Sequence, residues 1–71
     1  MDKLALILAI AQEVFEDDGL KDTLPLNKAA GYDSMKMVQF LIDVEEELKV
    51  NLLEKEINGK YTCQEIVEAI G

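Results

Sequence analysis

The segment from Asp33 to about Lys49 carries the strongest apolar periodicity of the chain, and this pattern predicts an amphipathic helix. One set of its apolar residues follows the i, i+3/i+4 rule within roughly 100° of arc, the width of a helix face that packs on a core. This set is Met37, Phe40, Leu41, Val44 and Leu48. No segment of the sequence shows the alternation of a strand, so we expect an all-α fold.

The first part of the chain predicts a helix followed by a long connection. The helix runs from Asp2 to about Glu16, and we expect Gly19 to close it in the left-handed conformation. Residues 20–33 are expected to form a long loop. Its isolated apolar side chains would attach it to the core: Leu20, Leu24, Leu26 and Tyr32.

Two more helices are expected in the last part of the chain. Asn51 with Glu54 is typical of a helix start, and Asn58-Gly59 would end this short third helix. The Thr-x-x-Glu pattern from Thr62 to Glu65 is a capping box that opens the last helix. The sequence thus predicts a small four-helix bundle with three longer helices, one short helix and a long loop between the first two. We expect it to form a single domain over residues 1–71.

The composition excludes several functional classes. Fifteen acidic residues against seven basic ones give a net charge of −8, which disfavours nucleic acid as a partner and favours basic protein surfaces. One cysteine and no histidine cannot complete a structural zinc site, and they leave a Ser or Cys nucleophile without its usual base. We therefore expect no enzymatic activity, and we interpret Cys63 as a packing residue.

The apolar run from Leu4 to Ala11 is too short to cross a membrane, and it lacks the flanking residues of a signal peptide. We interpret it as part of a core helix. The expectation is a cytoplasmic protein without stable membrane insertion.

A second apolar set lies on the helix predicted after Asp33. Met35, Val38 and Ile42 fall about 100–160° from the centre of the core-facing set. Glu45, Glu46 and Gln39 border them. Such a strip predicts a docking surface for a basic, apolar groove of a partner. The alternative is that these residues only widen the buried face of the helix.

Asp33 and Ser34 stand at the start of the same helix, where both residue types are preferred caps. Asp33 alone would suffice as the cap, and Ser34 lacks a capping-box partner because Met37 occupies the third position after it. Ser34 would then present an exposed hydroxyl on the first turn. The helix dipole and the free N–H groups there favour an attached phosphate.

The segment Gly31-Tyr32-Asp33-Ser34-Met35, followed by a helix that ends Val44-Glu45-Glu46-Glu47-Leu48, resembles the acyl carrier protein family. The resemblance covers essentially the whole chain. It implies that Ser34 carries 4′-phosphopantetheine, which a Mg²⁺-dependent phosphopantetheinyl transferase attaches from coenzyme A, and that acyl groups ride as thioesters on its thiol. It implies that Asp33 helps the transferase to handle metal and coenzyme. Met35 stands where the family usually has Leu.

The resemblance also implies a set of partner contacts. Met35, Val38, Ile42, Glu45 and Glu46 match the family's contact positions. Lys36 and Gln39 stand where fatty-acid carriers usually have acidic residues, so we hypothesise that Lys36 acts against the partners of a conventional synthase. The implied protein is a freestanding monomeric carrier. Its partners would be the transferase and the enzymes that load and process acyl groups in fatty-acid, polyketide or related biosynthesis.

Two alternatives stay open at the level of the sequence. The segment from Ile57 to Thr62 is loosely similar to that of aminoacyl or D-alanyl carriers, which would load an amino acid on the same arm. From a different class, the chain could be an acidic helical interaction module without a prosthetic group. Such a module would keep the docking surface and would not need Ser34.

Overall fold

The computed structural model describes residues 2–70, so Met1 and Gly71, the two ends of the expected domain, lie outside the described residues. Within that range the chain forms three α-helices, α1 (Lys3–Val14), α2 (Ser34–Leu48) and α3 (Cys63–Ile70). Two single turns of 3-10 helix stand between them, η1 (Leu26–Lys28) and η2 (Leu53–Lys55). Residues 2–70 contain no strand, which confirms the all-α expectation.

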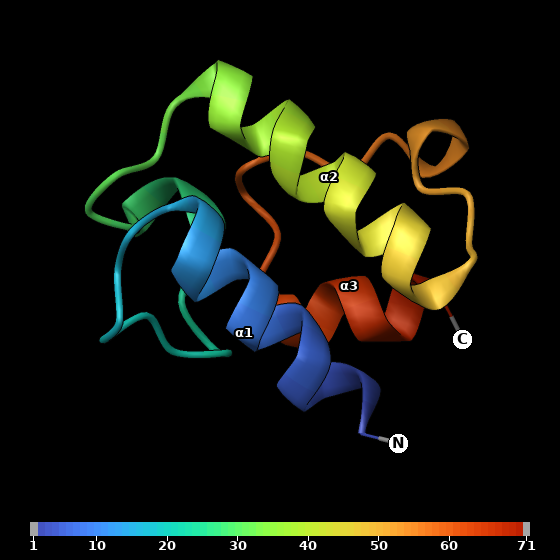
Figure 1. The fold of residues 1–71 in the computed structure, drawn as a ribbon, viewed down its shortest axis with the longest axis horizontal. Coiled ribbons are helices and arrows are strands. Elements are labelled where there is room, and N and C mark those ends of the chain that lie inside the picture. The colour runs from blue at the N-terminus through green and yellow to red at the C-terminus, as the bar shows by residue number, and fades with distance from the viewer. Residues whose placement is uncertain (1, 71) are drawn as a thin grey trace.

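Helix α1 packs against both α2 and α3 (Figure 1). It runs roughly antiparallel to α2, and the long loop joins them at one end of the molecule. The core between the helices is filled by the expected face of α2, with Met37, Phe40, Leu41 and Val44 buried and Leu48 packed against them. Each large side chain that is fully buried in this way contributes about 1.5–3 kcal/mol to folding.

The end of α1 differs from the expectation that Gly19 closes it. The left-handed residue is Glu16, with φ 53°, and Gly19 does not adopt positive φ. Phe15 is the C-cap residue and is fully buried, and the turn begins directly after it. The carboxylate of Asp17 then holds the turn, because Oδ1 accepts a hydrogen bond from the Gly19 N–H at 3.1 Å and Oδ2 accepts one from the Ala30 N–H at 3.0 Å.

The expected short helix after Asn51 is not confirmed, and the structure has the single 3-10 turn η2 in its place. Leu52 and Ile57 are both buried, although five residues apart on an α-helix they would point about 140° away from each other. Glu56 resolves this conflict, because its left-handed conformation, with φ 54°, ends the turn and brings Ile57 back to the core.

The long loop is attached to the core as expected through Leu20 and Leu26, which are buried. Leu24 differs, since 37% of it is exposed. The loop is also bonded to the segment before α3: the Leu26 N–H donates to the Tyr61 carbonyl at 2.9 Å, and the Asn27 N–H donates to the Gly59 carbonyl at 2.8 Å. These bonds hold the loop between α1 and α2 in place.

The capping box at the start of α3 is confirmed. The Thr62 Oγ1 accepts from the Glu65 N–H at 3.1 Å, and the Glu65 Oε1 accepts from the Thr62 N–H at 2.9 Å. A search for a membrane-spanning segment among residues 2–70 finds no helix with the length and apolarity to cross a bilayer.

Candidate functional site

The first turn of α2 has the cap geometry that the sequence predicts. Asp33 is the N-cap residue, in extended conformation, and its Oδ1 accepts a hydrogen bond from the Lys36 N–H at 2.7 Å. Its backbone carbonyl accepts the first helical bond, from the Met37 N–H at 3.0 Å. Ser34 is exposed and is the first residue of the helix, so the cap does not use its hydroxyl. This hydroxyl stands at the positive end of a helix of 15 residues.

The chain that leads into α2 is held by aromatic packing. The Tyr32 ring lies against the Phe15 ring, with centroids 5.6 Å apart, and Phe15 lies against Phe40 of α2 at 5.7 Å. Gly31 and Gly59 allow this packing, because a Cβ at Gly31 would collide with the Phe15 carbonyl and one at Gly59 would collide with the Tyr32 ring. The residues just before Ser34 are therefore packed against the end of α1.

Lys36 is not a free cation on the first turn of α2. Its Nζ donates to the Glu16 Oε2 at 2.8 Å, which joins the end of α1 to the start of α2. The hydrogen bond and the charge of Lys36 lower the pKa of the Glu16 carboxyl, and the hydrogen bond that Lys36 donates to Glu16 is the main cause that raises the pKa of Lys36. No pattern in the sequence predicts this pair, because the two residues are 20 positions apart.

The second apolar set of α2 is exposed and does not widen the buried face. Met35 is 82% exposed, Val38 53% and Ile42 38%. We call these three residues the exposed stripe. They lie within about 60° of one another around the helix axis, so they form one continuous apolar strip. The prediction that the stripe is a docking surface stays a prediction.

The two carboxylates predicted to border the stripe have different surroundings. Glu45 is partly buried, and its Oε2 accepts a hydrogen bond from the Leu52 N–H at 2.7 Å. It therefore ties the end of α2 to the chain before η2. Glu46 is exposed, and it lines both the stripe and the groove described next.

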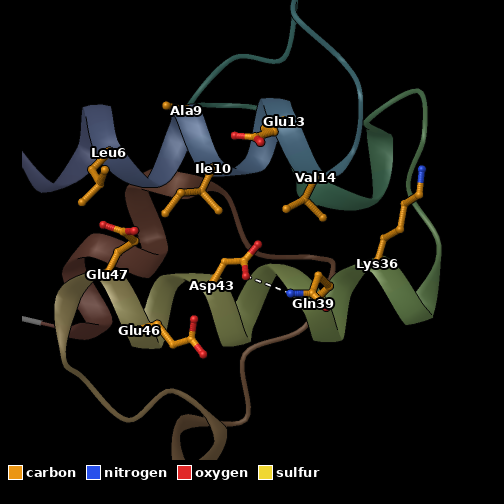
Figure 2. Close-up of a pocket in the computed structure, with 10 residues that line it drawn as sticks. All are labelled: Leu6, Ala9, Ile10, Glu13, Val14, Lys36, Gln39, Asp43, Glu46 and Glu47. Atoms are coloured by element: carbon orange, nitrogen blue, oxygen red, sulfur yellow. Dashed lines mark hydrogen bonds between the residues drawn. The ribbon is translucent and has the colours of Figure 1, made fainter.

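A groove of about 640 Å³ runs between α1 and α2 (Figure 2). The apolar side chains of Leu6, Ile10 and Val14 reach into it from α1, and Asp43 and Glu47 face it from α2. This α1–α2 groove was not predicted from the sequence. A pattern for it was present, since Leu6, Ile10 and Val14 recur every four residues on a face of α1 about 100–120° from the core residues Ala11 and Phe15.

Cys63 is fully buried at the start of α3. Burial, with a smaller effect from the negative charge of Asp22, raises the pKa of the thiol to about 11. A thiol that is protonated and covered is a packing group, as expected, and not a nucleophile.

The residues at the start of α2 fit a phosphodiester on Ser34. The hydroxyl is exposed, the cap is supplied by Asp33 and not by Ser34, and the first-turn N–H groups favour negative charge at this place. Ser34 is also the single serine of the sequence. Comparison with protein-family models, with curated proteins and with solved structures finds no match to this chain.

Proposed function

We propose that this protein is an acyl carrier protein that bears 4′-phosphopantetheine on Ser34. The observation that carries the proposal is the exposed hydroxyl of Ser34 on the first turn of α2, where Asp33 supplies the cap in its place. A serine that a helix needs as its cap would have its hydroxyl engaged with the backbone. Here the hydroxyl is left for a transferase to modify.

The residues of the chain would hold the arm and leave its chemistry to partners. The positive end of α2 favours the phosphate on Ser34 by about 0.3–1 kcal/mol at an exposed site. The bound arm supplies a thiol on which acyl groups are carried as thioesters. Tyr32, fixed against Phe15, holds the chain before the attachment point, so the base of the arm starts from a defined position. The protein itself would bring the arm to its partner enzymes and let it move between them, and it would not catalyse a reaction.

We propose that the exposed stripe docks partner enzymes. Met35, Val38 and Ile42 offer apolar contacts beside the attachment point, and the net charge of −8 steers the protein to basic surfaces. The partners would be a phosphopantetheinyl transferase and the enzymes that load and process acyl groups in fatty-acid, polyketide or related biosynthesis. Such a carrier would act as a monomer in the cytoplasm.

We further propose that the arrangement of α1, α2 and α3 is the carrier-protein bundle, with the 3-10 turn η2 in the place of its short third helix. The position of η2 supports this, since it lies between the end of α2 and the capping box of α3. Glu45 would be structural in this fold, because it holds the Leu52 N–H.

The experiment is an intact-mass measurement before and after incubation with coenzyme A, Mg²⁺ and a broad-specificity phosphopantetheinyl transferase. We expect one phosphopantetheinyl addition to the wild type and none to Ser34→Ala. Thr23→Ala is the matched control, since it removes an exposed hydroxyl from the loop and should accept the group like the wild type. Because Ser34 is not the cap, its replacement should change the free energy of unfolding by less than about 0.5 kcal/mol.

No addition to a folded wild-type protein would overturn the proposal and favour the interaction module without a prosthetic group. If the arm is attached, a second measurement identifies the cargo. The protein that bears the arm is incubated with a malonyl transferase and a malonyl donor, and separately with amino acids and their purified activating enzymes. Acceptance of an amino acid alone would make the protein an aminoacyl carrier.

A further inference from the structure

The α1–α2 groove is a second partly apolar surface of the protein, and it meets the exposed stripe at Glu46. Its α1 side is apolar except for Glu13: Leu6, Ile10 and Val14 project toward α2 and are only partly buried (Figure 2). Its volume is about 640 Å³. Apolar side chains that stay partly exposed along a groove between two packed helices are the feature that a helix-in-groove partner uses, and here α1 supplies them.

The charges around the groove are mostly of one sign. Asp43, Glu46 and Glu47 line it from α2, and Glu13 lines it from α1. Lys36 stands at the end near the start of α2, but its amine is bonded to Glu16. Asp43 keeps its carboxylate in place through the Gln39 amide, which donates to Oδ1 at 2.8 Å. The groove therefore combines an apolar side with carboxylates, which is the complement of a basic amphipathic helix.

A second copy of this chain does not have the matching chemistry. Its net charge of −8 would place like charges against the carboxylates of the groove. A partner with lysines or arginines beside an apolar strip brings opposite charges to the same carboxylates. Charge complementarity thus selects a basic partner segment.

The groove and Ser34 lie on different sides of α2. With about 100° per residue, Ser34 points roughly 180° away from the mean direction of Gln39, Asp43 and Glu47. The exposed stripe lies between the two. An occupant of the groove would therefore leave the Ser34 hydroxyl and most of the stripe open.

We propose that the α1–α2 groove binds an amphipathic helix of a partner protein, with an apolar strip that contacts Leu6, Ile10 and Val14 and with basic residues that pair with Asp43 and Glu47. This goes beyond the proposed carrier function, because it does not use Ser34 or any prosthetic group. It predicts that such a partner binds at the same time as an enzyme on the exposed stripe.

The test uses the full chain and a synthetic helical peptide with leucines on one face and lysines beside them. Binding is measured by fluorescence anisotropy of the labelled peptide and mapped by amide shifts in the ¹⁵N-labelled protein. The variant Asp43→Asn/Glu47→Gln removes two charges from the groove. Glu54→Gln/Glu68→Gln removes two exposed charges elsewhere and is the matched control. A peptide with glutamate in place of lysine controls for apolar contact alone.

We expect the groove variant to raise the Kd of the lysine peptide by about tenfold, and the control variant by less than about twofold. The shifted amides should be those of α1 and of α2 beside Asp43, and Leu6→Gln, with its fold verified by circular dichroism, should also weaken binding. Equal effects of the two charge variants would overturn the proposal, since they would indicate general attraction to an acidic protein. Four other results would also overturn it. These are amide shifts centred on Met35 and Val38, a Kd unchanged by Leu6→Gln, equal affinity for the glutamate peptide, and self-association of the protein.

Discussion

The contact of Gly31 with the end of α1 gives the sharpest test of how the start of α2 is held. A Cβ at position 31 would collide with the Phe15 carbonyl oxygen and would lie 3.1 Å from the Phe15 carbonyl carbon. Both atoms belong to the backbone at the C-cap of α1, and the Phe15 ring is packed between Tyr32 and Phe40. The clash in Gly31→Ala therefore has no flexible side chain to absorb it.

The three glycines that face other residues predict a graded series. Gly31→Ala should cost about 3 kcal/mol or more, the upper end of the cost of overpacking, because the backbone must move. Gly59→Ala should cost about 1–2 kcal/mol, since its Cβ would meet the hydroxyl end of Tyr32 and lie 2.8 Å from Cζ, and the ring can tilt in part. Gly19→Ala should stay within about 0.5 kcal/mol of the wild type, because its nearest neighbour, the Asp17 Oδ1, would be 3.6 Å away.

The assay is urea unfolding followed by far-UV circular dichroism, with thermal unfolding as a second measure. For a domain of this size each kcal/mol lowers Tm by about 4–8 °C, so Gly31→Ala should lose at least about 10 °C. Tyr32→Phe should recover part of the stability lost in Gly59→Ala, because it removes the nearest atom of the clash. If Gly31→Ala were as stable as Gly19→Ala, the close approach of the loop to α1 would be refuted.

Three further results are expected. Asp33→Ala should lower the free energy of unfolding by about 1 kcal/mol, because the Lys36 N–H loses its cap, and urea unfolding checks this. Lys36 lowers the pKa of the Glu16 carboxyl in the folded protein below its value near 4.5 in the unfolded chain. The stability that this pair contributes is therefore present above pH 4.5 and is lost as the pH falls through the pKa of Glu16 in the folded protein. Glu16 is 76% exposed, so Glu16→Gln should reduce stability only slightly at neutral pH, should abolish this acid-side loss, and should have less effect at high salt. Cys63 should resist alkylation in the folded protein and react on unfolding. The reason is that a pKa raised from 9.0 to about 11 lowers the thiolate fraction of Cys63 near neutral pH by about 100-fold. Mass spectrometry after timed exposure to iodoacetamide measures the difference in alkylation.

The parts of the molecule that the sequence predicted are those determined by contacts between near neighbours in the chain. The buried face of α2, the Asp33 cap and the capping box at Thr62 all depend on residues three or four positions apart. The exposure of Ser34 was predictable for the same reason, because the residue before it already supplies the cap. The exposed stripe was only half predictable. Periodicity separated Met35 and Val38 from the core face, but their exposure depends on where the other helices lie.

The parts of the molecule that the sequence did not predict depend on contacts between segments far apart in the chain. The pair of Lys36 with Glu16 and the groove beside it arise from the approach of α1 to α2. The turn η2 replaces a helix because Leu52 and Ile57 must both reach one core. The pair also alters the hypothesis about partner choice. The positive charge of Lys36 is paired with the negative charge of Glu16, so Lys36 should repel or attract a partner less strongly than an unpaired lysine would.

In the proposed function, helix α2 would use one face for stability and two others for recognition. Met37, Phe40 and Val44 are buried, so the helix keeps its place through contacts that no exposed substitution alters. The exposed stripe is centred about 140° from that face, and the groove side lies about 120° from it in the other direction. Substitutions on either exposed face should therefore change partner choice with little effect on folding, and their effects on two partners should add. A loss of additivity between Val38→Gln on the stripe and Asp43→Asn in the groove, measured for an enzyme and for the lysine peptide, would show that the two surfaces are one.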